Sequence, residues 1–425
     1  MNFKIFCPLC HWVAKSQTIP ILCPKCDEQS LLKLRHYIPL IWEDNNTLSN
    51  YLPWVVKDSS CQKTVSIFRM KELEQWVGLD QVSLLFSGFW PEQEGYLTSA
   101  SFKELDAISL FEWIKIAYKN KVLLSSSAGN TGRALYHVAL ALGEPVIIVI
   151  PDNAIKDFWI PNQANGNITP FLISVRNGTY QDAINLANRL STEFSSEIVT
   201  SGGVHNIVRR TALSFPYYYG VMKTKEVPKH YFQAVSTAAG AIGAYDVNSE
   251  LIQMKYTDKR TAIHMVQNHP FNPIVEAWNS ATHKFKKLSP IEVKQFHNQI
   301  YAKVLSNTNP PYHNKGGIHE VLSSSGGGAY SVSNQEVKQA QQKWHEFATV
   351  SLDPASLVAL AGLIKAVKAG AVQQHESVIL HLTGGGLEQS INANKLKQII
   401  PDVSVEKTQV NHAIAEVAHY LSTIH

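Results

Sequence analysis

The sequence has no apolar run long enough to cross a membrane and no excess of charge of either sign. Its most apolar strip, residues 146–150, is far shorter than the roughly 20 residues that a membrane-spanning helix needs. Charged residues make up 17%, and 38 Lys and Arg stand against 34 Asp and Glu, without a basic stripe. We therefore expect neither a membrane nor a nucleic-acid partner. With 45% hydrophobic residues in 425, disordered and fibrous classes are also excluded, and the length predicts about two or three globular domains.

Motifs of several common enzyme classes are missing as well. The chain has no G-x-x-x-x-G-K-[ST], G-x-S-x-G or H-E-x-x-H, and its two Gly triplets lack the third glycine of G-x-G-x-x-G, at Ser331 and Gln389. These absences disfavour P-loop NTPases, α/β-hydrolases, zincin metalloproteases and simple dinucleotide enzymes. Residues 1–7 lack the long apolar region of a signal peptide, so we expect a cytoplasmic protein with reduced thiols.

Cysteine is scarce, and its placement is informative. Four of the five cysteines form two Cys-x-x-Cys pairs separated by 12 residues, at Cys7, Cys10, Cys23 and Cys26. This spacing is typical of a ribbon whose four thiolates hold a structural zinc ion. Two alternatives stay open: metal-free thiols, and haem attachment, because His11 completes a Cys-x-x-Cys-His pattern. Haem attachment leaves the second pair unexplained. Cys61 stands alone and is interpreted as a packing residue.

Beyond the ribbon, apolar strand-like runs alternate with helical patterns. Strands are predicted at 122–124, 146–150, 171–175, 231–235 and 378–382, and helices at 133–142 and 180–190. This alternation predicts an α/β fold with parallel sheets. Ligands bind such sheets beyond the carboxyl ends of the strands, where small residues follow three of these runs.

Three turns place small residues at the start of a predicted helix, where free backbone N–H groups favour an anion. Residues 125–133 suit a carboxylate, although an ordinary capped turn is an equal interpretation. Residues 235–243 suit a phosphate or, alternatively, a close helix contact. In the third turn, Lys103 follows small residues. Taken alone it is interpreted as a solvated surface lysine, but away from water its amine is suited to forming a Schiff base.

Together these segments resemble the fold-type-II enzymes that use pyridoxal 5′-phosphate (PLP), and in particular the threonine synthase branch. Ser-Phe-Lys at 101–103 and Ser-Ala-Gly-Asn-Thr-Gly-Arg at 127–133 are marks of that family. Within the branch the chain is similar to the cysteate synthases, from the first cysteine pair through nearly the whole chain. The further shared segments are 86–91, 101–105, 182–187, 353–356 and 383–386.

The resemblance implies two doubly wound, parallel-sheet domains of the tryptophan synthase β-like type, preceded by a zinc-ribbon-like segment. We expect residues 1–38 to form the ribbon, residues 39–110 and 211–425 the larger, PLP-binding domain, and residues 111–210 the smaller domain. Family members commonly form dimers, so a homodimer is expected.

The resemblance also implies roles for single residues. Lys103 would hold PLP as an imine and act as general base and acid at Cα. Asn130 would lie beside the cofactor's ring hydroxyl, and Thr383 would face its pyridine nitrogen, where a neutral hydroxyl favours elimination and replacement at Cβ. The PLP phosphate would lie on Ser236, Thr237, Ala238, Ala239, Gly240 and Ala241. The substrate carboxylate would lie on Ser127, Ala128, Gly129 and Thr131.

Three features weigh on this assignment. Arg209 and Arg210 lie in a segment that resembles the family. They are interpreted either as binding a phosphate or sulfonate or, equally, as part of an ion pair on a helix surface. Arg209 is the preferred substrate-binding candidate. Alanines replace most glycines of the family's phosphate loop. The added methyl groups restrict φ, so the loop can bind the PLP phosphate if every loop residue has negative φ. Glu388 and Gln389 stand where the family tends to carry basic residues, which points to a different acceptor or leaving group.

The predicted activity is PLP-dependent β-replacement on O-phospho-L-serine through an aminoacrylate intermediate, with the anion sulfite as nucleophile, giving L-cysteate and phosphate. The alternatives are threonine synthase-type conversion of O-phospho-L-homoserine, β-replacement with another nucleophile, and a non-catalytic PLP-binding homologue. The alanine-rich loop is the main support for the last of these.

Overall fold

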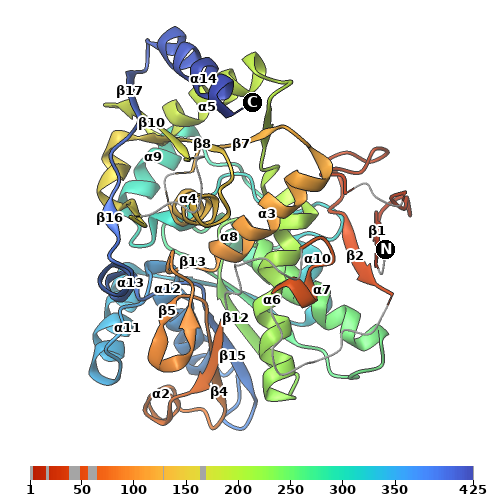
Figure 1. The fold of residues 1–425 in the computed structure, drawn as a ribbon. Helices are drawn as coiled ribbons and strands as arrows, with labels where there is room; N and C mark the ends of the chain where they lie inside the picture. Colours follow the sequence, from red (N-terminus) through yellow and green to blue (C-terminus); the bar gives the residue numbers. More distant parts are fainter. Residues whose placement is uncertain are drawn as a thin grey trace.

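The computed structural model describes residues 3–15, 19–37, 48–55, 65–127, 129–162 and 169–424. Its two main sheets are each covered by helices on both faces, with the five-stranded sheet toward the top of Figure 1 and strands β4, β12 and β15 of the six-stranded sheet toward the bottom. The predicted α/β class is therefore confirmed.

The six-stranded sheet has the order β14-β13-β12-β15-β4-β3, and its neighbours run parallel except for the edge pair β3 and β4. Its strands are β3 (Ser66–Arg69), β4 (Val82–Phe86), β12 (His230–Ala234), β13 (Ala262–Asn268), β14 (Gly328–Val332) and β15 (Val378–Leu382). One face packs against α2 (Lys71–Val77), α11 (Asn334–Phe347) and α12 (Pro354–Lys368). The other packs against α6 (Ile207–Thr224), α7 (Ala239–Gln253), α8 (Pro273–Asn279) and α10 (Ile318–Ser325). Side chains alternate between these faces, as the two-residue period of a strand requires.

The five-stranded sheet is entirely parallel and has the order β11-β7-β8-β10-β17. Its strands are β7 (Val122–Ser125), β8 (Val146–Pro151), β10 (Phe171–Arg176), β11 (Ile198–Thr200) and β17 (Val403–Glu406). One face packs against α3 (Lys103–Ala117) and α4 (Asn130–Leu142), and the other against α5 (Tyr180–Glu193) and α14 (Val410–Ile424). All of the predicted strands and helices that we placed by residue range are present, within a few residues of the expected ends.

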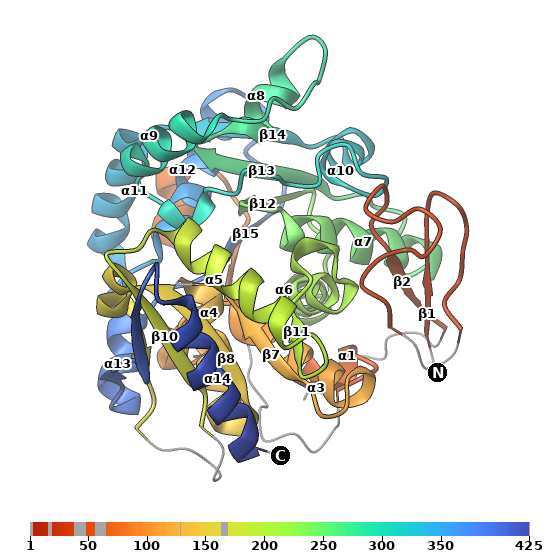
Figure 2. The same cartoon turned by 90° about the horizontal axis from the view of Figure 1, so that it is seen from above.

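The C-terminal segment departs from the expected domain limits. Strand β17 pairs with β10 of the five-stranded sheet, and α14 packs on the same sheet, whereas we had assigned residues 211–425 to the larger domain. Figure 2 shows α14 beside β10 and far from the six-stranded sheet. Periodicity identifies a short edge strand but does not say which sheet edge it joins, so the sequence alone could not predict this return.

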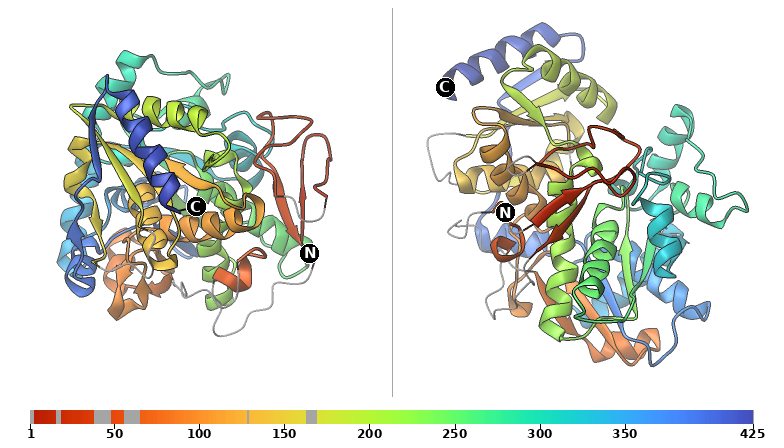
Figure 3. Two further views of the ribbon diagram at one scale, coloured as in Figure 1. Left: turned by 45° about the horizontal axis from the view of Figure 1, so that its top comes forward. Right: turned by 90° about the vertical axis from the view of Figure 1, so that its right-hand side faces the viewer.

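The N-terminal segment is a separate small unit that packs on the larger sheet's helices. Strands β1 (Phe3–Phe6) and β2 (Lys33–His36) pair antiparallel and lie beside α7 in Figures 2 and 3. An ion pair between Lys33 and Asp246, and hydrogen bonds from His36 to Glu250, attach β2 to α7. The remaining elements are β5 (Phe89–Trp90), β6 (Gly95–Tyr96), β9 (Trp159–Ile160), β16 (Lys397–Gln398), α1 (Leu48–Tyr51), α9 (Pro290–Gln299) and α13 (Leu387–Asn394).

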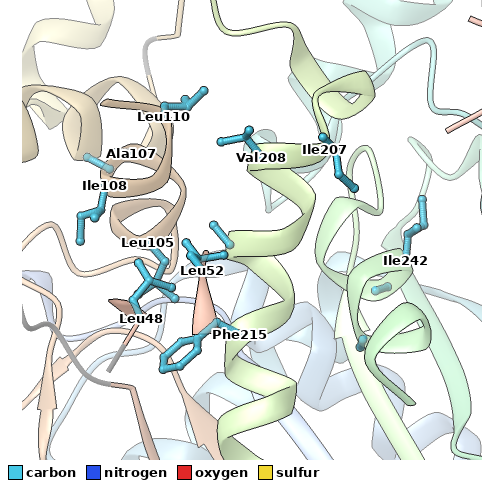
Figure 4. Close-up of a cluster of buried hydrophobic side chains, with 14 of the residues drawn as sticks. Leu48, Leu52, Leu105, Ala107, Ile108, Leu110, Ile207, Val208, Phe215 and Ile242 are labelled. Carbon is cyan, nitrogen blue, oxygen red and sulfur yellow. The ribbon is translucent and has the colours of Figure 1, made fainter. Parts of the chain in front are cut away.

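Helix α3 lies in the core between the two sheets. Every residue from Glu104 to Ile114 is buried; in Figure 4, Leu105 lies near Phe215 of α6, and Leu110 lies on the side of α3 that faces Val208. A helix that is buried around most of its circumference must be surrounded by other elements. The core therefore determines where the first residue of α3, Lys103, is held.

Candidate active site

The turn before α3 is joined to the end of β15. Phe102 N–H donates to Thr383 O at 3.0 Å, and Gly385 N–H donates to Ala100 O at 3.1 Å. These bonds connect residues far apart in sequence, and they place Lys103 beside the Thr383 turn at the carboxyl end of β15. Ala100 has a φ of +56°, a left-handed conformation that is unfavourable for alanine. The turn is thus held against a local backbone preference.

The Lys103 amine is mostly shielded from water. Its side chain is 21% exposed, and Nζ lies 4.7 Å from the centre of the Phe102 ring and 4.0 Å from Asp106 Oδ2. Burial lowers the pKa of Lys103 to about 8; Asp106 opposes this shift, and the charge of Arg209 reinforces it. About a tenth of the amine is therefore uncharged at pH 7, far more than at the ordinary lysine pKa, as a nucleophilic lysine requires.

Asp106 lies between Lys103 and Arg209. The Arg209 Nε lies 2.9 and 3.1 Å from the two carboxylate oxygens, and Nη2 donates to Oδ2 at 2.6 Å. The Asp106 side chain is only 1% exposed, and Arg209 Nη1 donates to Ser201 Oγ at 3.1 Å. Arg209 thus forms a buried ion pair between α3 and α6, beside the lysine. Sequence reasoning missed Asp106, although its position three residues after Lys103 on one helix was a usable signal.

The neighbouring arginine has a different environment. Arg210 is 1% exposed and donates to the backbone carbonyls of Leu32, Val204 and His205. It therefore connects α6 to the N-terminal unit. Only Arg209 of the pair lies near the lysine, and its substrate-binding role stays a prediction.

The predicted carboxylate loop follows β7 and leads into α4. Asn130 is the first residue of α4; its Nδ2 donates to Asp353 Oδ2 at 3.0 Å, and its Oδ1 accepts from Arg133 Nη2 at 2.9 Å. Ser127, Gly129 and Thr131 are half-buried around it, and Ala128 lies outside the described residues. A side chain at Gly132 would place its Cβ 1.8 Å from Ser127 O, so this tight turn requires glycine.

The predicted phosphate loop forms the start of α7. Ala239 shares an apolar cluster with Phe102, which places this loop next to the lysine turn. Ser236 and Thr237 are half-buried, whereas Gly240 and Ala241 are buried. Ala238, however, has a φ of +61°, so the condition that all loop residues have negative φ is not met. The αL conformation there is the one that glycine adopts without cost.

Thr383 itself is 5% exposed and is followed by a glycine turn that leads into α13. A Cβ at Gly386 would lie 1.8 Å from Phe89 O. Glu388, the residue that replaces an expected basic position, is exposed at the surface. The fold thus brings the carboxyl end of β15 close to the starts of α3, α4 and α7.

The four ribbon cysteines also converge. Their Sγ atoms all lie within 4.8 Å of one another, and Cys10 Sγ is 3.6 Å from Cys23 Sγ. A tetrahedral zinc ion with Zn–S bonds of about 2.3 Å would separate its sulfur ligands by about 3.8 Å, so the four thiolates of Cys7, Cys10, Cys23 and Cys26 fit zinc. Cys61 lies outside the described residues. A cavity of about 640 Å³ near the ribbon is lined by none of the predicted site residues.

Comparison with known proteins identifies the family. Residues 77–384 match the family model described as pyridoxal-phosphate dependent enzyme. The chain belongs to this family. The matched segment contains Lys103, Thr383 and all other residues that we expected to contact cofactor or substrate, and it begins after the ribbon cysteines. Among the described residues of this enzyme, none of the helices has the length and apolar character needed to cross a bilayer.

Relatives named cysteate synthase cover most of the enzyme. The protein from Methanoregula boonei is 35% identical over 360 residues, 83% of each chain. The protein from Methanospirillum hungatei is 30% identical over 411 residues, 96% of this chain and 95% of the relative. Both results agree with the resemblance seen in the motifs.

Solved structures confirm the predicted fold. Maize serine racemase has a TM-score of 0.55 at 15% identity, with 78% of this chain and 92% of that chain covered. A pyridoxal 5′-phosphate-dependent aspartate racemase has a TM-score of 0.53 at 12% identity, with 76% and 90% covered. At these identities the likeness concerns the fold alone, which is that of fold-type-II PLP enzymes.

The side chains present fit PLP. The cofactor needs an amine that can lose its proton, a set of N–H donors for its phosphate, and a polar environment for its ring. Lys103 supplies the first, and the first turn of α7 supplies the second, since its leading N–H groups have no partner within the helix. Asn130 and Thr383 lie on the two turns that flank the lysine.

Proposed function

We propose that this enzyme catalyses β-replacement on O-phospho-L-serine, with sulfite as the nucleophile and L-cysteate and phosphate as the products. The relatives named cysteate synthase support this reaction, because two of them match this chain at 30 to 35% identity over 83 to 96% of its length. The structural observation that supports it most directly is the shielded amine of Lys103, with a pKa of about 8, beside the Thr383 turn.

Lys103 has two tasks in this proposal. Its Nζ would hold PLP in the resting enzyme, and as a free amine it would accept the Cα proton of the bound substrate. When bound, PLP supplies an electron sink for the electron pair released at Cα. The Cβ–O bond then breaks and its electrons leave with phosphate; sulfite forms the new Cβ–S bond through sulfur, and Lys103 returns the proton to Cα. Asp106, at 4.0 Å, stabilises the protonated lysine between these transfers.

The anionic groups of the substrates require donors in the same place. The Ser127–Thr131 turn is proposed to bind the substrate carboxylate at the start of α4. Arg209 uses three of its five N–H bonds for Asp106 and Ser201, so two remain for the leaving phosphate or the incoming sulfite. Because Asp106 already fixes the guanidinium, little side-chain entropy would be lost when the anion binds.

Product analysis separates this reaction from its alternatives. Purified enzyme would be incubated with O-phospho-L-serine or O-phospho-L-homoserine, with and without sulfite, and phosphate and amino-acid products would be measured. We expect sulfite-dependent cysteate from O-phospho-L-serine. Threonine from O-phospho-L-homoserine without sulfite would refute the proposal and favour the threonine synthase reaction. Phosphate release from O-phospho-L-serine without cysteate would indicate another nucleophile.

The role of Lys103 is tested independently by absorption spectroscopy. Wild-type enzyme with PLP should absorb at the violet edge of the visible range, and Lys103→Ala should lose both this absorption and turnover. Lys115→Ala is the matched control, because Lys115 lies on the same helix but is 40% exposed and pairs with Glu112 and Glu144. A colourless wild-type protein that PLP cannot reconstitute would instead support a non-catalytic homologue. The homodimer and a bound zinc ion also stay predictions.

A further inference from the structure

A chain of four buried polar side chains lies behind the candidate site. Ser87, Tyr231, Gln233 and His381 are each at most 3% exposed, and they come from the carboxyl end of β4, from β12 and from β15. His381 is two residues before Thr383, and its ring packs edge-on against the Phe102 ring at 5.6 Å. None of the four was identified from the sequence.

The donation from Tyr231 to Gln233 sets a direction for the hydrogen bonds of this chain. Burial lowers the pKa of His381 to about 3, so the imidazole is neutral and carries one N–H. Tyr231 O–H donates to Gln233 Oε1 at 2.9 Å, so its oxygen accepts from His381 Nδ1–H at 2.6 Å. His381 Nε2 then accepts from Ser87 O–H at 2.9 Å.

The Gln233 amide lies against the first turn of α7. A Cβ at Gly240 would lie 2.8 Å from Gln233 Nε2 and 2.9 Å from Oε1, so glycine at this position leaves space for the amide. Because Oε1 accepts from Tyr231, Nε2 is the atom left to donate on this side. Within the described part of the chain, the side-chain hydrogen bond of Gln233 is the one that it accepts from Tyr231. The groups that a helix start presents are N–H donors, which cannot accept a hydrogen bond. An anion at this helix start could accept from these N–H groups and from the Gln233 amide together.

We propose that Gln233 donates a hydrogen bond from Nε2 to the PLP phosphate at the start of α7, and that Ser87, His381 and Tyr231 orient its amide. This side-chain donor would supplement a loop in which alanine methyl groups crowd the approach to the backbone. The inference rests on the PLP part of the proposed function and is independent of the nucleophile.

The test compares PLP with pyridoxal, which has the same aldehyde and ring but no phosphate. Dissociation constants of both would be measured on apo-enzyme by absorbance titration, for wild type, Gln233→Met and Tyr231→Phe. We expect Gln233→Met to weaken PLP binding by about 10- to 100-fold, the range for a hydrogen bond to a charged group, and to leave pyridoxal binding within about 3-fold. Tyr231→Phe should also weaken PLP binding more than pyridoxal binding, but by a smaller factor.

Gln267→Met is the matched control. Gln267 is another fully buried glutamine, on β13, and its Oε1 accepts from the start of α8 rather than facing α7. Its replacement should lower thermal stability without changing the ratio of PLP to pyridoxal affinity. Equal weakening of both ligands by Gln233→Met, or no weakening of PLP, would overturn the inference. If Gln233→Met does not fold, the ratio of PLP to pyridoxal affinity in Tyr231→Phe tests the inference instead. Absence of cysteate with normal PLP binding would refute only the proposed nucleophile.

Discussion

Mild acid is expected to destabilise this enzyme, because His264 is buried without charge. The residue lies on β13, is 3% exposed, and stacks on the Phe232 ring at 4.3 Å. Its Nε2 is 2.9 Å from His230 Nδ1, and its Nδ1 has no hydrogen-bond partner in the described structure. Burial, and secondarily the nearby His230, lower the pKa of His264 to about 3, while Glu376 acts in the opposite direction.

The direction and size of the effect follow from this pKa. Above about pH 6.5, the ordinary histidine pKa, neither the folded nor the unfolded state protonates His264. As the pH falls from about 6.5 toward 3, the unfolded chain takes up a proton that the folded chain does not, so folding becomes less favourable. At about 1.4 kcal/mol per pH unit, the loss between pH 7 and pH 5 is about 2 kcal/mol. His381, with a pKa also lowered to about 3, should contribute a similar amount.

Urea unfolding at several pH values between 7 and 5 tests this reasoning. His264→Gln removes the titrating group, so the fall in unfolding free energy over this range should be about 2 kcal/mol smaller than in wild type, whatever the variant's stability at pH 7. His412→Gln, at an exposed position on α14, should leave the pH dependence unchanged. An identical pH dependence in wild type and His264→Gln would refute the buried neutral state.

Three further predictions concern the site and the ribbon. Asp106→Asn should lower the pKa of Lys103 by about 1 to 3, because the substitution removes a negative charge 4.0 Å from Nζ and leaves the positive charge of Arg209. The pH dependence of borohydride trapping of PLP on the apo-enzyme measures this pKa. An unchanged pH dependence would contradict the prediction. Ala238→Gly should raise stability by about 1 kcal/mol in thermal unfolding, whereas Ala241→Gly, in the first turn of α7, should lower it by a similar amount. Cys7→Ser should release bound zinc, as measured by elemental analysis; equal zinc content in variant and wild type would argue against the ribbon site.

The sequence by itself determined the local features of this protein. Strand and helix periodicity located five strands of the two main sheets and the helices α4 and α5, because the order of apolar residues reflects which faces are buried. The start of α3 at Lys103 and the two cysteine pairs were also readable, because both depend on residues close together in the chain. Motif order was enough to predict the family that the comparisons then showed.

Only the tertiary structure decided which distant groups meet. Asp106 and Arg209 are separated by about a hundred residues, yet their contact controls the charge around Lys103. The αL conformation of Ala238, the pairing of β17 with β10 and the orientation of the Gln233 amide likewise depend on neighbours from other strands and helices. Hydrogen-bond direction and burial are properties of a packed interior, and no local pattern of residues specifies them.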